Sequence, residues 1–308
     1  MAFSTSFKVE KARPEFPAWV GTHQALIERV LSDALPNADC APQKLHSAMR
    51  YAVLGRGKRV RPLLAFAAGE LTGAAPARIA RVGAAVELIH AYSLVHDDLP
   101  CMDDDVLRRG KPACHVEYDV ATALLTGDSL HSLAFHILSE VRLAATGEAQ
   151  LEMVRLLAYA AGSRGMAGGQ AIDLASEGKS LGVPELEYMH IHKTGALIRA
   201  SVMLGAHCGE IADEDVLQRL DRYAKCIGLA FQVVDDVLDA ESSTATLGKT
   251  VGKDLNRDKP TYVSALGVNA ARELASELKN DALVAISPFS GRALRLRELA
   301  EFIVSREF

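Results

Sequence analysis

The sequence of 308 residues lacks several features that would assign it to common protein classes. Its five cysteines are odd in number, widely spaced and without a C-x-x-C pair, which argues against a disulfide scaffold or zinc site and favours a reducing compartment. No uncharged apolar run reaches the length of a transmembrane helix. Residues 1–16 mix charges and lack an apolar core, so no secretory signal is predicted and we expect a cytoplasmic protein.

Charge and aromatic content exclude further classes. Lys and Arg number 34 against 39 Asp and Glu, a formal net charge of -5, which argues against a nucleic-acid partner bound by bulk electrostatics. Aromatic residues make up only 6%, which favours helix over sheet. The 49% of hydrophobic residues are enough to bury a sizeable core.

Apolar residues recur at three- and four-residue spacing along much of the chain, the pattern of helices with one buried face. The segments are Val82–Val95, Leu124–Leu138, Leu151–Ala161, Ala196–Leu204, Leu217–Leu238 and Leu294–Ile303. Because the breaks between them are short and turn-like, we predict one all-α domain over residues 1–308, with ten or more helices. The polar stretches Glu241–Pro260 and Gly178–Pro184 are predicted to be functional loops.

The strongest chemical signal is an acidic run at the end of an apolar helix. Five carboxylates fall within nine residues from Asp97 to Asp105, and Arg108 and Arg109 follow. Like charges this close raise one another's pKa values unless cations offset them. Clusters of carboxylate oxygens suit hard ions such as magnesium, although an acidic run alone can also be a solvated helix end.

A second acidic cluster favours the metal interpretation. Asp235, Asp236 and Asp239 follow Gln232 on another apolar helix, and Asp235 and Asp239 lie one turn apart on one face. Carboxylates beside apolar side chains are costly to bury unless a cation or hydrogen bonds compensate. We therefore predict two facing helices that hold magnesium between them.

Basic residues complete the pattern. The segment Gly55–Pro62 contains four basic residues and two glycines, so its backbone can approach a phosphate that Lys and Arg bind. It is not a Walker loop, because G-x-x-x-x-G-K-[ST] is absent. Further cations follow at Lys193, Lys249, Lys253 and Lys259. Together the clusters indicate two phosphorylated groups, one bridged by metal and one held directly by Arg and Lys.

The two motifs Asp97-Asp98-x4-Asp103 and Asp235-Asp236-x-x-Asp239 resemble those of trans-type polyprenyl diphosphate synthases, most closely the bacterial farnesyl-type members. The match extends from Gly57-Lys58-Arg59 to Lys259-Pro260, with Val106 as one departure from a run that is often acidic. The resemblance implies a helical bundle around a deep central cavity (isoprenoid synthase type), usually a homodimer. It also implies the condensation of isopentenyl diphosphate with an allylic diphosphate such as dimethylallyl or geranyl diphosphate.

The resemblance further implies roles for individual residues. Several magnesium ions, or manganese in their place, would bridge the allylic diphosphate to Asp97, Asp98, Asp103, Asp235, Asp236 and Asp239. The same diphosphate would be neutralised by Arg108, Lys193, Lys249 and Lys259, while Thr194 and Gln232 would line the reacting centre. Isopentenyl diphosphate would be bound without metal by Gly57, Lys58, Arg61, His90 and Arg109. The departing diphosphate would serve as the final base.

Product length is predicted from the helix that precedes Asp97. Tyr92 lies five residues upstream, about 7.5 Å deeper along the helix, and Ser93 adjoins it. In the resembled family an aromatic residue at this depth blocks elongation, so a C15 product, farnesyl diphosphate, is expected. A C20 or C10 product, and a tyrosine that merely packs in the core, remain as alternatives.

Three rival functions fit parts of the pattern. A terpene cyclase would need no second diphosphate site, so the basic residues around Gly57 and at Arg108 and Arg109 argue against it. A silent subunit of a heteromeric synthase should have lost an aspartate motif, and both are present. A helical protein that only binds divalent ions leaves the basic residues unexplained.

Overall fold

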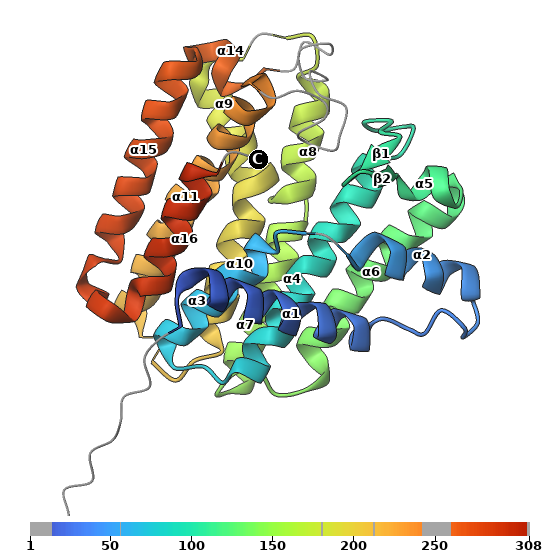
Figure 1. Ribbon diagram of the computed structural model, residues 1–308, viewed down its shortest axis with the longest axis horizontal. Helices are drawn as coiled ribbons and strands as arrows, with labels where there is room; N and C mark the ends of the chain where they lie inside the picture. The colour runs from blue at the N-terminus through green and yellow to red at the C-terminus, as the bar shows by residue number, and fades with distance from the viewer. Residues whose placement is uncertain (1–13, 56, 180, 212, 242–259, 307–308) are drawn as a thin grey trace, which may run out of the picture.

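The computed structural model describes residues 14–55, 57–179, 181–211, 213–241 and 260–306, which form mostly helices (Figure 1). The α-helices in chain order are α1 (Phe16–Ala34), α2 (Gln43–Val53), α3 (Val60–Thr72), α4 (Pro76–Asp97), α5 (Cys114–Glu117), α6 (Val120–Glu140), α7 (Gly147–Ala161), α8 (Met166–Ala175), α9 (Val183–His190), α10 (Ala196–His207), α11 (Glu214–Glu241), α14 (Tyr262–Leu266), α15 (Val268–Ala285) and α16 (Leu294–Ser305). Two shorter helical segments are the π-helical η1 (Ile191–Gly195) and the 3₁₀-helical η2 (Ser287–Ala293). The all-α prediction is confirmed, and the six predicted helical segments lie in α4, α6, α7, α10, α11 and α16.

The centre of the fold is built from α3, α4 and α10, whose residues are largely buried. Glycine allows two of these helices to meet backbone to backbone, since a Cβ at Gly205 of α10 would lie 2.2 Å from the Ala65 carbonyl oxygen of α3. Pro76 starts α4 at a position where a missing N–H costs nothing. The helix then runs through the core, and Asp97 is its last residue.

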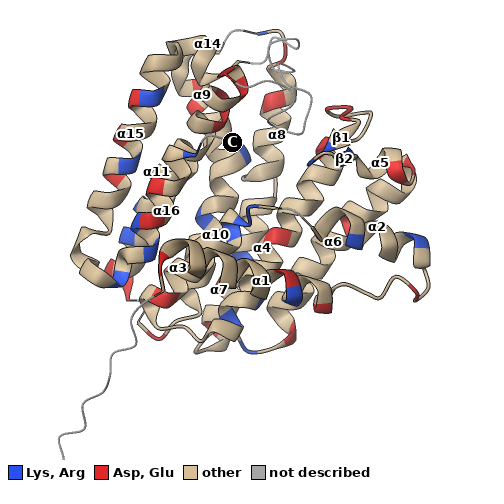
Figure 2. Cartoon of the chain, in the orientation of Figure 1, with Lys and Arg blue, Asp and Glu red and all other residues tan. Residues whose placement is uncertain are grey.

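The outer helices carry charges of both signs, as bands along α11, α15 and α16 show (Figure 2). Within the described ranges, no helix combines the length and apolar character needed to cross a membrane. The predicted loop at Gly178–Pro184 connects α8 to α9, which begins at Val183. Most of the second predicted loop, Glu241–Pro260, lies outside the described residues.

A small hairpin follows the first aspartate motif and was not predicted. It pairs β1 (Leu107–Arg108) with β2 (Lys111–Pro112). The turn residues Arg109 and Gly110 have positive φ angles of 55° and 74°, the arrangement of a tight two-residue hairpin turn. Strands this short leave no alternating pattern in the sequence. The turn holds a non-glycine residue in the left-handed region, a strain that is common near functional sites.

Candidate active site

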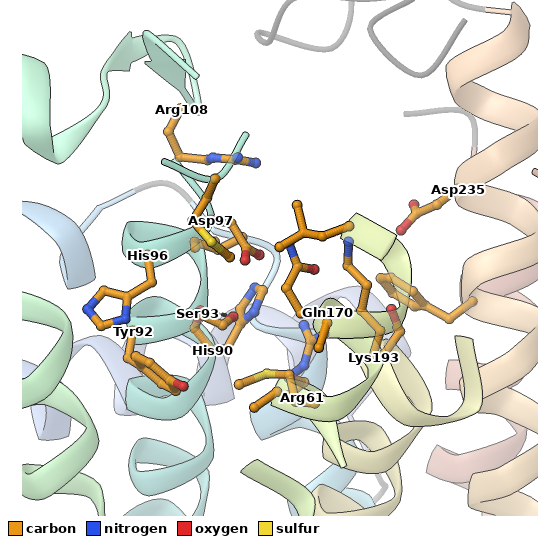
Figure 3. Close-up of a pocket in the computed structure, with 18 of the residues that line it drawn as sticks. Arg61, His90, Tyr92, Ser93, His96, Asp97, Arg108, Gln170, Lys193 and Asp235 are labelled. Atoms are coloured by element: carbon orange, nitrogen blue, oxygen red, sulfur yellow. Dashed lines mark hydrogen bonds between the residues drawn. The ribbon is translucent and has the colours of Figure 1, made fainter. Parts of the chain in front are cut away.

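A cavity of about 540 Å³ lies between α4, α8, η1 and α11 (Figure 3). Predicted residues that line it are Arg61, His90, Tyr92, Ser93, Asp97, Arg108, Arg109, Lys193, Thr194 and Asp235. Apolar side chains such as Met102, Met166 and Leu174 line it as well. The fold therefore gathers cations, carboxylates and an apolar surface around one space.

Asp97 is the last residue of α4 and faces the cavity across from Lys193 (Figure 3). Its backbone carbonyl accepts a 2.8 Å bond from the Asp103 N–H, so the loop coils back at the helix end. Burial raises the pKa of Asp97 to about 6, with Lys193 opposing and Asp103 adding to this effect. An added cation would stabilise this carboxylate.

Asp98 caps α4 and is only 2% exposed. Arg108 reaches it from β1 in a bidentate pairing, with Nε 3.0 and 3.2 Å from the two carboxylate oxygens and Nη2 on Oδ1. Burial raises the pKa of Asp98, while the Arg108 bond lowers it. Two residues predicted to serve magnesium and the allylic diphosphate are thus paired with each other, and Arg108 also lines the cavity.

On the opposite wall, α11 presents the half-exposed Asp235 to the cavity (Figure 3). Its Oδ1 accepts a 2.7 Å bond from Arg306, the residue that follows the end of α16. The Arg306 guanidinium lies 3.8 Å from the centre of the Phe231 ring and donates to the Phe231 carbonyl. Sequence reasoning missed Arg306, because a lone arginine far from any motif carries no signal.

A chain of hydrogen bonds links the second motif to Thr194, which lines the cavity. The Thr194 hydroxyl donates to Gln232 Oε1 at 2.8 Å, and Gln232 Nε2 donates to Asp236 Oδ1 at 2.8 Å. The other oxygen of Asp236 accepts from the Tyr262 N–H at 2.8 Å. Asp236 is 7% exposed, so here it orients Gln232 and the start of α14.

Lys193 and Thr194 lie in the π-helical turn η1, which joins α9 and α10. Two glycines allow neighbouring helices to pack closely against this turn. A Cβ at Gly169 of α8 would lie 2.1 Å from the backbone nitrogen of Lys193, and one at Gly228 of α11 would lie 3.0 Å from the Gly195 Cα. Turns of this kind are frequent at functional sites.

Of the residues predicted to bind isopentenyl diphosphate, Arg61, His90 and Arg109 line the cavity, whereas Gly57 and Lys58 do not (Figure 3). A Cβ at Gly57 would lie 2.9 Å from Arg109 Nη1, so glycine lets that guanidinium pack on the loop. The pKa of His90 is well below its usual value, mainly because the ring is buried and also because Arg61 and Arg109 carry positive charge nearby. His90 is therefore neutral. The pKa of Lys58 is lowered by partial loss of water around its ammonium group and then by the charge of Arg306, although the residue as a whole is exposed. An anion would offset this excess of positive charge.

Gln170 and Asp173 of α8 were not predicted. Gln170 lines the cavity and is 8% exposed, yet neither of its amide atoms has a hydrogen-bond partner among the described residues. Asp173 accepts a 2.6 Å bond from Lys193 Nζ. The signal in the sequence was available, since two polar residues stand about one turn apart on a glycine-rich apolar helix.

The other predicted site residues are placed less directly. Asp103 lies in the loop after α4, and Asp239 lies one turn beyond Asp235 on α11; neither lines the cavity. Ser93 lines the cavity and donates its hydroxyl to the His90 carbonyl at 2.9 Å. Lys249 and Lys259 fall outside the described residues.

The carboxylates of Asp97 and Asp235 are donors that suit magnesium. In the part of the chain that the structure describes, no three His, Cys, Asp or Glu side chains converge on one point. Magnesium commonly takes one or two protein carboxylates and completes its shell with water and phosphate oxygens. The donors therefore fit an ion that binds together with a diphosphate.

The sequence profile of the polyprenyl synthetase family matches residues 42–284, and the chain belongs to this family. It is a prenyl diphosphate synthase, a transferase. It is 46% identical over 287 residues to farnesyl diphosphate synthase of Haemophilus influenzae, covering 92% of this chain and 96% of that protein. It is 43% identical over 295 residues to a chloroplastic geranylgeranyl pyrophosphate synthase of Catharanthus roseus, covering 95% and 82%.

A solved structure gives the same fold. The geranyltransferase of Helicobacter pylori, complexed with magnesium and isoprenyl diphosphate, aligns with a TM-score of 0.82 at 31% identity, covering 94% of this chain and 97% of that one. The predicted family, fold and reaction class are therefore confirmed, and the family uses magnesium. Product length stays open, because the relatives are named for both C15 and C20 products.

Proposed function

We propose that this chain condenses isopentenyl diphosphate with dimethylallyl and then geranyl diphosphate, forms farnesyl diphosphate and releases diphosphate. The observation that supports this most is the arrangement of Asp97 and Asp235 on opposite walls of one cavity that also contains Arg61, His90 and Arg109. One part of the cavity suits a metal-bridged diphosphate, and the other suits a diphosphate held by cations alone.

The allylic diphosphate is held between the two acidic walls. Asp97 and Asp235 would hold magnesium, with Asp103 and Asp239 joining them. Asp98 and Asp236 support the two motifs through their bonds to Arg108 and Gln232. When bound, magnesium ions, or manganese in their place, neutralise the leaving diphosphate. Lys193 adds a protein cation at the same place, and its pairing with Asp173 fixes its position. Arg108, Lys249 and Lys259 are assigned to the same diphosphate.

Isopentenyl diphosphate binds to Arg61, Arg109, Lys58 and the neutral His90, beside the Gly57 backbone. Its double bond attacks the allylic carbon as the carbon–oxygen bond ionises and diphosphate departs. The cation left by this new carbon–carbon bond then loses one proton to the departing diphosphate, which restores a double bond. Thr194 lines the cavity beside the reacting carbons, and its hydrogen bond to Gln232, which does not line the cavity, resists rearrangement as charge develops. Met102, Met166 and Leu174 keep water from the allylic cation.

We also propose that the chain acts as a homodimer. Leu124 and Leu125 of α6 are 46% and 53% exposed on adjacent positions, and Val120 is 49% exposed one turn earlier. An apolar strip of this kind is typical of a subunit interface. Light scattering at several concentrations tests this, and a monomer at all of them would contradict it.

The decisive test is a product-length assay with magnesium, isopentenyl diphosphate and dimethylallyl diphosphate. We expect a C15 product from the unmodified chain and longer products from Tyr92→Ala. Tyr159→Ala is the matched control, because this tyrosine of α7 is exposed and does not line the catalytic cavity. A C20 product from the unmodified chain would refute Tyr92 as the limit, and no product from any allylic starter would refute the function.

A further inference from the structure

The ring of Tyr92 is held between two imidazole rings. His96, one turn along α4, lies with its ring centre 5.1 Å from that of Tyr92 at an interplanar angle of 81°. His131 approaches from α6 with the same 5.1 Å separation at 79°. Both are edge-to-face contacts, the geometry that aromatic rings favour. Tyr92 and His96 line the cavity, whereas His131 does not, so His131 belongs to a second layer.

The first support, His96, is fixed by the backbone of α6. A Cβ at Gly127 would lie 2.0 Å from His96 Nε2, so only glycine leaves room for this imidazole. The same nitrogen is 3.0 Å from the Leu124 carbonyl oxygen, which requires that it carry the proton and donate it. His96 is thus tied to its place independently of Tyr92.

The second support, His131, is held by packing. Its ring lies 5.2 Å from that of Phe135, one turn further along α6. Burial is the main cause that lowers the pKa of His131, so the ring is neutral at neutral pH and packs as an uncharged aromatic group. Tyr92 packs against the main hydrophobic core as well. A chain that lengthens against Tyr92 therefore presses on a ring whose far side rests on His131.

We propose that His131 is a positioning residue that sets product length through Tyr92. The inference rests on the proposed function and deepens it, because it assigns part of the length limit to a residue outside the cavity. If the His131 side chain is removed, the Tyr92 ring can move away from the cavity and leave room for a longer product.

The test compares three variants of the full chain in the assay described above, with the ratio of C20 to C15 product as the readout. His131→Ala opens space behind Tyr92 and should raise the ratio about threefold to tenfold, the population change that loss of one edge-to-face contact allows. His131→Phe keeps an aromatic edge and should retain the original ratio. His136→Ala is the matched control, since this exposed histidine lies on the same helix outside the Tyr92 cluster.

A double variant separates positioning from general loosening. In Tyr92→Ala the supported ring is absent, so adding His131→Ala should change the ratio no further. An unchanged ratio in His131→Ala, an equal rise in His136→Ala, or an additive effect in the double variant would each overturn the inference while the synthase function stands. Absence of prenyl product from the unmodified chain would instead overturn the proposed function, and the inference with it.

Discussion

The two aspartate motifs use their first two residues in the same way. Asp97 and Asp235 face the cavity, whereas Asp98 and Asp236 are buried and bonded to the scaffold. In each doublet, therefore, one carboxylate is presented to the ligand and its neighbour fixes the local backbone. The acidic doublets look uniform in the sequence, and the structure divides them.

The walls differ in where their partners come from. Asp98 is bonded to Arg108, ten residues away in the adjoining hairpin. Asp235 and Asp236 are bonded to Arg306 and to the Tyr262 N–H, 71 and 26 residues away. The first wall is therefore a local unit, while the second depends on docking of the C-terminal helices. Four experiments test this comparison.

The largest effect is expected where a carboxylate faces the cavity. Asp97→Asn or Asp235→Asn should lower turnover by about a thousandfold, because charge in the transition state loses its electrostatic support. Asp97→Asn should leave the free energy of unfolding unchanged or raise it, since burial already disfavours this charge. The checks are a product assay and urea denaturation. Asp215→Asn, on an exposed part of α11, is the control. More than a tenth of the original turnover would contradict the assignment.

The two buried aspartates, Asp98 and Asp236, should affect the free energy of unfolding more than they affect turnover. Asp236→Ala leaves the Gln232 amide and the Tyr262 N–H without their acceptor, and should reduce the free energy of unfolding by about 3 kcal/mol. Asp98→Ala should cost about 2 kcal/mol, because Arg108 retains partial access to water. Urea denaturation measures both. Equal stability of the buried and the cavity-facing variants would break the comparison.

Acid should affect the two walls with opposite signs. The pKa of His190, which stacks on Tyr262, is lowered by burial to about 4, so the unfolded chain binds the extra proton between about pH 6.5 and 4 and stability falls as the solution is acidified. The pKa of Asp97 is raised to about 6, so the folded protein binds the extra proton between about pH 6 and 4, and acid stabilises it there.

Single variants separate these contributions. With a metal chelator present, the free energy of unfolding should fall by about 2–3 kcal/mol between pH 7 and 4, and His190→Asn should remove this loss. Asp97→Asn should steepen that loss. We would follow the free energy of unfolding by urea denaturation at several pH values, and identical pH profiles for both variants and the unmodified chain would contradict the two assignments.

The smallest effect is expected in the hydrogen-bond chain of the second wall. Thr194→Val removes the donor to Gln232 Oε1 and should lower turnover about tenfold, the equivalent of one hydrogen bond. Thr194→Ser keeps the hydroxyl and should remain within about twofold of the original turnover, since that bond is kept. A serine variant as slow as the valine variant would show that the methyl group, not the bond, matters.

Much of this site could be predicted from the sequence because its signals are local. Helical periodicity gave the elements, and the two acidic doublets marked the walls that hold Asp97 and Asp235. Arg306 could not be found, because its partner is 71 residues away and no pattern links them. The division of labour between Asp235 and Asp236 was hidden as well, since it depends on which side chain meets α14.

The turn η1 also affects which length changes the chain can accept. A π turn contains one residue more than the α-helical turn it replaces, so the helix from α9 to α10 carries a single-residue insertion in its middle. Deleting any residue between Ile191 and Gly195 could restore a regular helix with both ends in place. Only the residues inside the turn would then change direction, because the helices on either side keep their places. In this helix, a change of one residue in length would therefore leave the fold intact while it moved Lys193 or Thr194 out of the cavity.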